Sequence, residues 1–185
     1  TFVKELVERL VDENIEITVY CHKNIFDDYP RQVNGVNLIY LQTIEKKSLS
    51  QLLHSFQSMI HACFSDVDII LVVNSANGPF GAISTIFRKK TAINVDGLEW
   101  LRPKWKGFGG KYFYWASKLS TKLYDEVIND SDAMAVFYIN EFNAESTVIA
   151  YGANIRYSEK PELINKWNLK KNDYYLIVGR LIPDN

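Results

Sequence analysis

The sequence lacks several features that would assign it to a function class at once. Its 185 residues include two cysteines, Cys21 and Cys63, without a Cys-x-x-Cys pair or a metal-ligand spacing. This pattern predicts two buried thiols in a reducing compartment rather than a disulfide framework. No apolar run approaches the roughly 20 residues that span a bilayer, and no signal peptide is visible. We therefore expect a soluble, cytoplasmic protein, with peripheral association at the inner face of the cell membrane left open.

Charge and catalytic motifs are equally sparse. With 21 basic and 22 acidic residues the formal net charge is −1, so no nucleic-acid partner is predicted. His54 and His61 lie seven residues apart without a third ligand, and we interpret them as packed or half-exposed helix residues rather than metal ligands. The glycine-rich "GFGG" (Gly107–Gly110) precedes a predicted helix instead of joining a strand to one, which indicates a hinge rather than a nucleotide cradle. No pattern supports a hydrolase.

What the sequence does contain is a regular alternation of strands and helices. Apolar and β-branched runs predict strands at 15–21, 36–43, 67–75, 91–95, 125–130, 146–153 and 174–180. Helical spacing predicts helices at 1–14, 48–64, 79–90, 111–124, 131–142 and 161–169, with Ser48 and Ser131 as N-caps. The nearly continuous apolar run at 67–75 is typical of a parallel strand covered on both faces. The pattern predicts an α/β fold with a doubly wound, mostly parallel, Rossmann-like sheet.

In such sheets the ligand crevice lies beyond the carboxyl ends of the strands. The hydroxyl, amide, carboxylate and aromatic groups near those ends suit a polyhydroxylated ligand, because polar groups bind sugar hydroxyls and aromatic rings stack on a pyranose face. The candidate binding residues are His22, Asn74, Asn77, Gly78, Asp96, Gly97, Glu99, Trp100, Arg102, Trp105, Tyr151 and Gly152.

Structural interpretations compete with several of these assignments. Asp130 and Ser131 are most simply a helix cap. Trp100 and Trp105 can close the core instead of forming a stacking wall. Glu99 and Arg102 can form an ordinary salt bridge instead of binding a ligand.

The stretch "NVDGLEWLRPKW" (Asn94–Trp105), followed by a "KY" helix, "DEVINDS", "STVIAYGA" and "YYLIVGRLIPDN", resembles a known family. It is similar to the rhamnosyltransferases of bacterial capsule and rhamnose-polysaccharide synthesis, which are of the glycosyltransferase family 4 type with a GT-B fold. The resemblance covers most of the chain from about Asn94 onward and is weaker upstream.

This resemblance implies a two-domain enzyme that needs no bound metal or other cofactor. It divides the chain into an acceptor-binding domain at 1–155, which lacks the first strand and glycine-rich loop, a linker and helix at 156–172, and the first strand of a truncated donor domain at 173–185. The implied donor is dTDP-rhamnose, bound mainly by the other domain, and the implied acceptor is a polyprenyl-diphosphate-linked saccharide. The fragment is not expected to turn over alone.

Residue roles follow from the same resemblance. Asp96, with Gly97, lies where related enzymes place a turn beside the reacting sugar, so Asp96 is the expected hydrogen-bond acceptor or general base. Trp100 and Trp105 are the expected stacking wall, Glu99 and Arg102 the expected contacts to acceptor hydroxyls. Independently of the resemblance, the position of His22 at a strand end makes it a candidate for acid–base chemistry or substrate contact, with a loop histidine without such a role as the simpler interpretation. A non-catalytic sugar- or nucleotide-binding α/β module is the alternative function.

Overall fold

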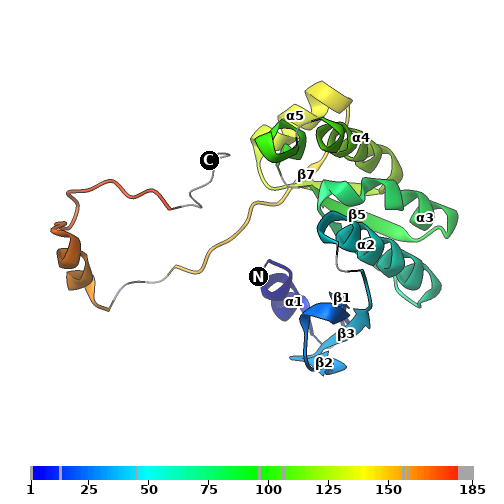
Figure 1. The fold of residues 1–185 in the computed structure, drawn as a ribbon, viewed down its shortest axis with the longest axis horizontal. Helices are drawn as coiled ribbons and strands as arrows, with labels where there is room; N and C mark the ends of the chain where they lie inside the picture. Colours follow the sequence, from blue (N-terminus) through cyan, green and yellow to red (C-terminus); the bar gives the residue numbers. More distant parts are fainter. Residues whose placement is uncertain are drawn as a thin grey trace.

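The computed structural model describes residues 2–12, 14–44, 46–95, 97–105, 107–155, 157 and 159–178, with the side chains of 47 and 48 excepted. Within these residues the strands form two sheets, one of four strands and one of three (Figure 1). The α/β prediction with a parallel, Rossmann-like sheet is confirmed. No helix in the described ranges is long and apolar enough to cross a bilayer.

The larger sheet is parallel throughout and has the order β4-β5-β6-β7. Its strands are β4 (Ile69–Val73), β5 (Lys90–Val95), β6 (Glu126–Asn129) and β7 (Thr147–Val148). The helices are α2 (Lys47–Phe64), α3 (Gly81–Ile86), α4 (Phe108–Leu123) and α5 (Asp132–Phe142). These helices follow one another in a row along the sheet (Figure 1), as right-handed crossovers between sequential strands require.

The smaller sheet has the order β1-β3-β2 and follows helix α1 (Phe2–Leu10). Strands β1 (Thr18–His22) and β3 (Val36–Leu41) are parallel, while β2 (Gln32–Val33) pairs antiparallel with β3. Sequence analysis missed β2, although Asn34 and Gly35 both have positive φ (50° and 81°), as a type I′ hairpin requires. The Asn-Gly pair was the available signal.

The core lies between the four-stranded sheet and its row of helices. Met59 and Cys63 of α2 pack there with Ile93 and Val95 of β5 and Tyr138 of α5. Cys63 is buried as predicted, whereas Cys21 is half-exposed, and both are free thiols.

Strand β4 differs from its prediction. Ile70 and Val72 pack against the core, but Ile69 and Leu71 are 70% and 44% exposed, so the strand is not covered on both faces. Side chains alternate between faces of a strand, and the helices of the row cover one face. Within the described residues β4 is also an edge strand, as is β1 of the smaller sheet.

Several element ends also differ from the predictions. Helix α2 begins at Lys47 after Lys46 as N-cap, so Ser48 lies inside the helix. Ser131 is the N-cap of α5 as predicted, although its hydroxyl bonds Asp130 and not a backbone N–H of the helix. Helix α4 begins at Phe108, three residues earlier than predicted.

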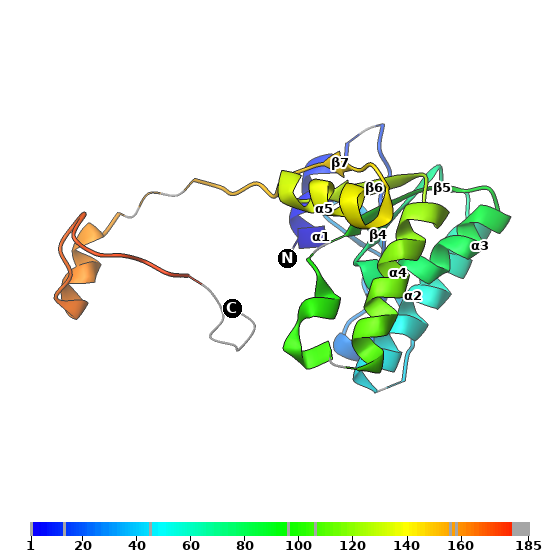
Figure 2. The same cartoon turned by 90° about the horizontal axis from the view of Figure 1, so that it is seen from above.

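The predicted strand at 146–153 is reduced to the two residues of β7, and the helix at 161–169 is a 3₁₀ helix, η5 (Pro161–Trp167). Residues 174–178 have no regular secondary structure, contrary to the prediction, because no strand of the described chain pairs with them. From 159 to 178 the chain extends away from both sheets (Figures 1 and 2). The division into two domains stays a prediction.

Candidate functional site

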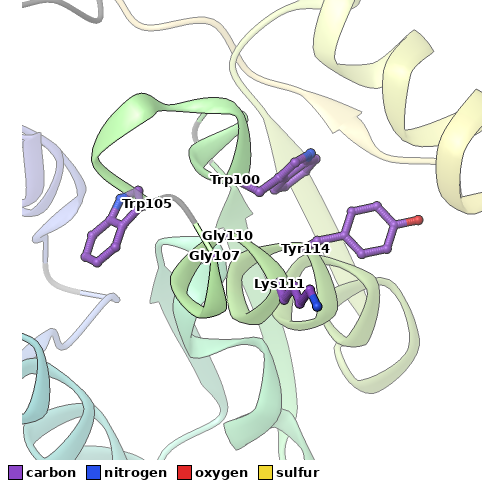
Figure 3. A pocket seen from close by; sticks show the side chains of 6 residues that line it. All are labelled: Trp100, Trp105, Gly107, Gly110, Lys111 and Tyr114. Atoms are coloured by element: carbon purple, nitrogen blue, oxygen red, sulfur yellow. The ribbon is translucent and has the colours of Figure 1, made fainter.

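A cavity of about 350 Å³ lies where β5 leads into α4. We call it the aromatic pocket. Its lining residues are Trp100, Trp105, Gly107, Gly110, Lys111 and Tyr114. Figure 3 shows Trp100 and Tyr114 on one side of the first turns of α4 and Trp105 on the other. The pocket thus lies at the carboxyl edge of the parallel sheet, where sequence analysis placed the ligand.

Two short 3₁₀ helices, η3 (Glu99–Leu101) and η4 (Pro103–Trp105), fold back onto the first turn of α4. A Cβ on Gly110 would lie 2.7 Å from the Trp105 carbonyl oxygen and 3.3 Å from that of Trp100. Gly110 is therefore needed for close packing. Gly107 is the N-cap of α4 and Gly110 lies in its first turn, so this stretch begins a helix; its interpretation as a hinge stays a prediction.

The Glu99 carboxylate lies beneath the pocket and holds the Trp105 side chain in place. Its side chain is 10% exposed, and Arg102 Nη1 lies 2.8 Å from Oε1. Trp105 Nε1 donates to Oε2 at 2.8 Å, and Lys104 Nζ is 3.7 Å from the same oxygen. The salt-bridge interpretation of Glu99 and Arg102 is confirmed. This carboxylate orients Trp105, and both of its oxygens already have partners within the protein.

Both pocket tryptophans pack against aromatic neighbours and also line the cavity. Trp100 lies 5.7 Å from the Tyr114 ring and 5.9 Å from Phe137. Trp105 lies 4.8 Å from the Phe113 ring. Each indole is half-buried, so one side closes the core while another borders the pocket. The two interpretations of these residues are compatible.

Lys111 and Tyr114 were missed by sequence analysis. They are three residues apart on α4, a spacing that puts them on one face of a helix. The Tyr114 hydroxyl donates to Glu141 Oε1 at 2.7 Å, and this hydrogen bond raises the pKa of Tyr114. Both residues lie inside the helix predicted at 111–124, but no local pattern shows that they face the residues of η3 and η4 across the pocket.

The turn after β4 is the 3₁₀ helix η2 (Ser75–Phe80), and its predicted binding residues have structural roles. Asn74 has φ 79°, and its side chain accepts from the Ala76 N–H at 2.8 Å. Buried Asn77 donates to the Val73 carbonyl. A Cβ on Gly78 would lie 2.0 Å from the Ala116 carbonyl oxygen of α4. These residues shape the turn and do not line the pocket.

Two tyrosines hold η2 against α4. Tyr112 donates to the Ala76 carbonyl at 2.8 Å, and Tyr124 donates to the Asn77 carbonyl at 2.9 Å. Burial raises the pKa of both hydroxyls, most strongly for Tyr124. Both therefore remain donors at neutral pH, and neither is a general base.

The other predicted site residues near the carboxyl edge of the sheet differ in where the structure places them. Tyr151 donates to Asn94 Oδ1 of β5 at 3.2 Å, so it reaches the sheet edge, whereas Gly152 is exposed. Gly97 has φ 64°, which favours glycine in the loop after β5. Asp96, the predicted catalytic residue, lies outside the described residues.

His22 belongs to a separate cluster on the smaller sheet. Its ring stacks on His54 of α2 with centroids 3.8 Å apart, and its Nδ1 lies 3.4 Å from Thr43 Oγ1. Burial, with the neighbouring His22 ring, lowers the pKa of His54. His54 is packed as predicted, and His61 is exposed and bonded to the Tyr20 hydroxyl. His22 does not line the aromatic pocket.

Comparison with known protein families shows to which family this chain belongs. A family model described as "Domain of unknown function (DUF1972)" matches residues 52–154, more than half of the chain. The chain belongs to the DUF1972 family. This domain is found in glycosyltransferase-associated proteins, in the region similar to the N-terminal part of family 4 enzymes. No curated protein matches the chain.

The DUF1972 match includes every residue of the aromatic pocket, together with η2 and Tyr151, but not His22. It also includes a second cavity of about 360 Å³ at the opposite, amino-terminal edge of the sheet. None of the predicted site residues lines that cavity. Within the described ranges of this DUF1972 chain, no group of three His, Cys, Asp or Glu side chains could hold a metal ion.

Proposed function

We propose that this chain is the acceptor-binding domain of a glycosyltransferase that transfers rhamnose from dTDP-rhamnose to a lipid-linked saccharide. The observation that carries the proposal is the aromatic pocket at the carboxyl edge of the sheet, in a DUF1972 domain. The nucleotide-sugar is bound mainly by a second domain, as the resemblance to rhamnosyltransferases implies.

The size and lining of the pocket support a saccharide ligand. The pocket is a shallow depression, widely open to solvent, with about 350 Å³ of accessible space, which suits one face of a sugar ring. Indole and phenol rings offer flat apolar faces on which the C–H face of a pyranose can pack. Contacts between two aromatic rings contribute about 0.5–1.5 kcal/mol, and we take the same range for a ring against a sugar. No hydrogen bond of the Trp100 indole N–H is found within the described chain, so this group is available to a sugar hydroxyl.

Asp96 is the proposed catalytic group. It directly precedes Gly97 and follows β5, whose carboxyl end lies beside the pocket. We assign to its carboxylate the role of accepting a hydrogen bond, or a proton, from the attacking acceptor hydroxyl. Glu99 cannot take this role because its oxygens are occupied by Arg102 and Trp105.

A transfer assay tests the proposal on the complete protein that carries this domain. The protein is incubated with dTDP-rhamnose and a polyprenyl-diphosphate-linked saccharide, and rhamnosylated product is measured. Asp96→Asn should abolish transfer while the acceptor still quenches tryptophan fluorescence. Trp100→Phe should raise the acceptor KM roughly fivefold, which corresponds to about 1 kcal/mol of lost ring contact.

Trp115→Phe is the matched control, because Trp115 lies half-exposed on α4 and does not line the pocket. Its acceptor KM should equal that of the wild type. Saccharide binding without transfer from any nucleotide-sugar would favour a non-catalytic binding module. Equal effects of Trp100→Phe and Trp115→Phe would reject the pocket as the acceptor site.

A further inference from the structure

Among the described residues that line the aromatic pocket, Lys111 alone has a charged side chain. Its charge has no ion-pair partner within the described residues. The two carboxylates that contact the pocket aromatics are engaged by other groups. Glu99 binds Arg102 and Trp105, and Glu141 accepts from Tyr114. Within the described residues, an exposed lysine therefore borders a largely apolar pocket and has no carboxylate partner.

The helix that carries Lys111 offers this exposed side chain no ion-pair partner. The sequence of α4, FGGKYFYWASKLSTKL, contains no acidic residue, so Lys111 has no i,i+3 or i,i+4 salt bridge. It is the fourth residue of the helix, near the end where the helix dipole disfavours a cation. Lys118 and Lys122, in contrast, lie further along, toward the favourable end of the helix dipole.

We infer that Lys111 binds the phosphate of a sugar-linked diphosphate whose sugar ring lies against Trp100 and Tyr114. An ammonium group is a compact charge that suits a phosphate oxygen, and the adjacent rings suit the pyranose to which the phosphate is attached. This inference rests on the proposed function, because it assumes that a saccharide occupies the pocket. Two ligands present this chemistry, namely the lipid-linked acceptor and the nucleotide-sugar.

Direct binding to the complete protein that carries this domain tests the inference. The probes are farnesyl-diphosphate-linked glucose, farnesyl glucoside without phosphate, and dTDP-rhamnose, each titrated by tryptophan fluorescence. Lys111→Met should weaken the binding of a diphosphate probe about tenfold, equivalent to about 1.4 kcal/mol, and leave the glucoside unchanged. Lys111→Arg should retain most of the affinity because it keeps the charge.

Lys118→Met is the matched control, since Lys118 lies seven residues further along the same face of α4 and outside the pocket. It should bind every probe as the wild type does. The advantage of the diphosphate probe over the glucoside should also shrink as salt is raised. Whichever diphosphate probe Lys111→Met weakens identifies the lipid or the nucleotide as the source of the phosphate.

Equal affinity of wild type and Lys111→Met for both diphosphate probes would overturn the inference. An equal loss of diphosphate and glucoside binding would also overturn it, because Lys111 would then act on pocket shape and not on charge. If the wild type binds the glucoside but gains nothing from the diphosphate, this inference fails and the proposed function stands. If the wild type binds no saccharide at all, the proposed function itself fails.

Discussion

The substitution Gly78→Ala distinguishes a packing role of Gly78 from its predicted role in ligand binding. Its ideal Cβ would lie 2.0 Å from the Ala116 carbonyl oxygen and 2.6 Å from Ser120 Oγ, both on α4. Because Cβ contacts below 3.0 Å are essentially never observed, Gly78→Ala would force η2 and α4 apart by about 1 Å. The Ser120 hydroxyl is itself buried and bonded to Ala116, so it cannot move aside.

The magnitude follows from two opposing effects. Overpacking of a close-packed interior costs about 1–3 kcal/mol or more, and a backbone carbonyl yields less than a side chain. Replacing glycine also restricts the unfolded chain, which stabilises by about 0.4–1 kcal/mol. The net loss in free energy of unfolding should be about 2 kcal/mol or more. For a chain of this length that lowers Tm by about 4–8 °C.

Urea unfolding followed by far-UV circular dichroism measures this loss. Gly152→Ala is the matched control, because Gly152 is exposed, has no atom within 4 Å of its ideal Cβ, and was equally a predicted binding residue. It should change stability by less than about 0.5 kcal/mol. If Gly78→Ala were as stable as the wild type yet failed to bind saccharide, the packing argument would be refuted and the predicted ligand contact restored.

Three further predictions concern buried charge, protonation and the open sheet edge. Glu99→Gln should lower the free energy of unfolding by about 1–2 kcal/mol, because a nearly buried carboxylate loses charge-assisted bonds. The exposed pair of Glu5 and Arg9 provides the control, since Glu5→Gln should cost under about 0.5 kcal/mol. Because the pKa of His54 is lowered in the folded chain, the unfolded chain takes up a proton at this imidazole at a higher pH than the folded chain does. The free energy of unfolding should therefore fall as the pH drops below 6.5. His54→Phe should flatten that part of the pH profile in thermal melts, and an unchanged profile would contradict the assignment. Ile69→Lys should reduce self-association in sedimentation velocity, because an exposed apolar edge strand is a pairing template. The helical substitution Ile86→Lys, at an equally exposed position, should have no such effect.

The sequence predicted the alternation of elements well because each strand and helix carries its own apolar period. It could not predict which faces are covered, since cover depends on neighbours that a local pattern does not identify. Strand β4 is the example: its five apolar residues match a buried strand, yet Ile69 and Leu71 are exposed. For the same reason the apolar run at 174–178 forms no strand without a partner.

The position of the aromatic pocket could be predicted from the sequence, whereas part of its lining could not. The rule that ligands bind at the carboxyl edge of a parallel sheet identified the stretch Asn94–Trp105. Asn77 and Gly78 also lie at that edge, but polar and small residues there serve the turn itself. Lys111 and Tyr114 were missed because a helical pattern does not show which side chains border a pocket, and this pocket depends on the close approach of η4 to α4 at Gly110.

The arrangement of Glu99 and Gly110 has a consequence for binding. Glu99 fixes the orientation of Trp105 through Nε1, and Gly110 allows the backbone of both pocket tryptophans to rest on α4. The aromatic walls are therefore held by contacts within the protein itself, so the saccharide that we propose as the ligand would not have to order them. Binding to a preorganised site loses less conformational entropy, and affinity then depends on the groups that face the cavity. Substitutions behind the pocket, such as Glu99→Gln, should accordingly weaken saccharide binding through wall disorder, while Lys111→Met should act on the phosphate alone.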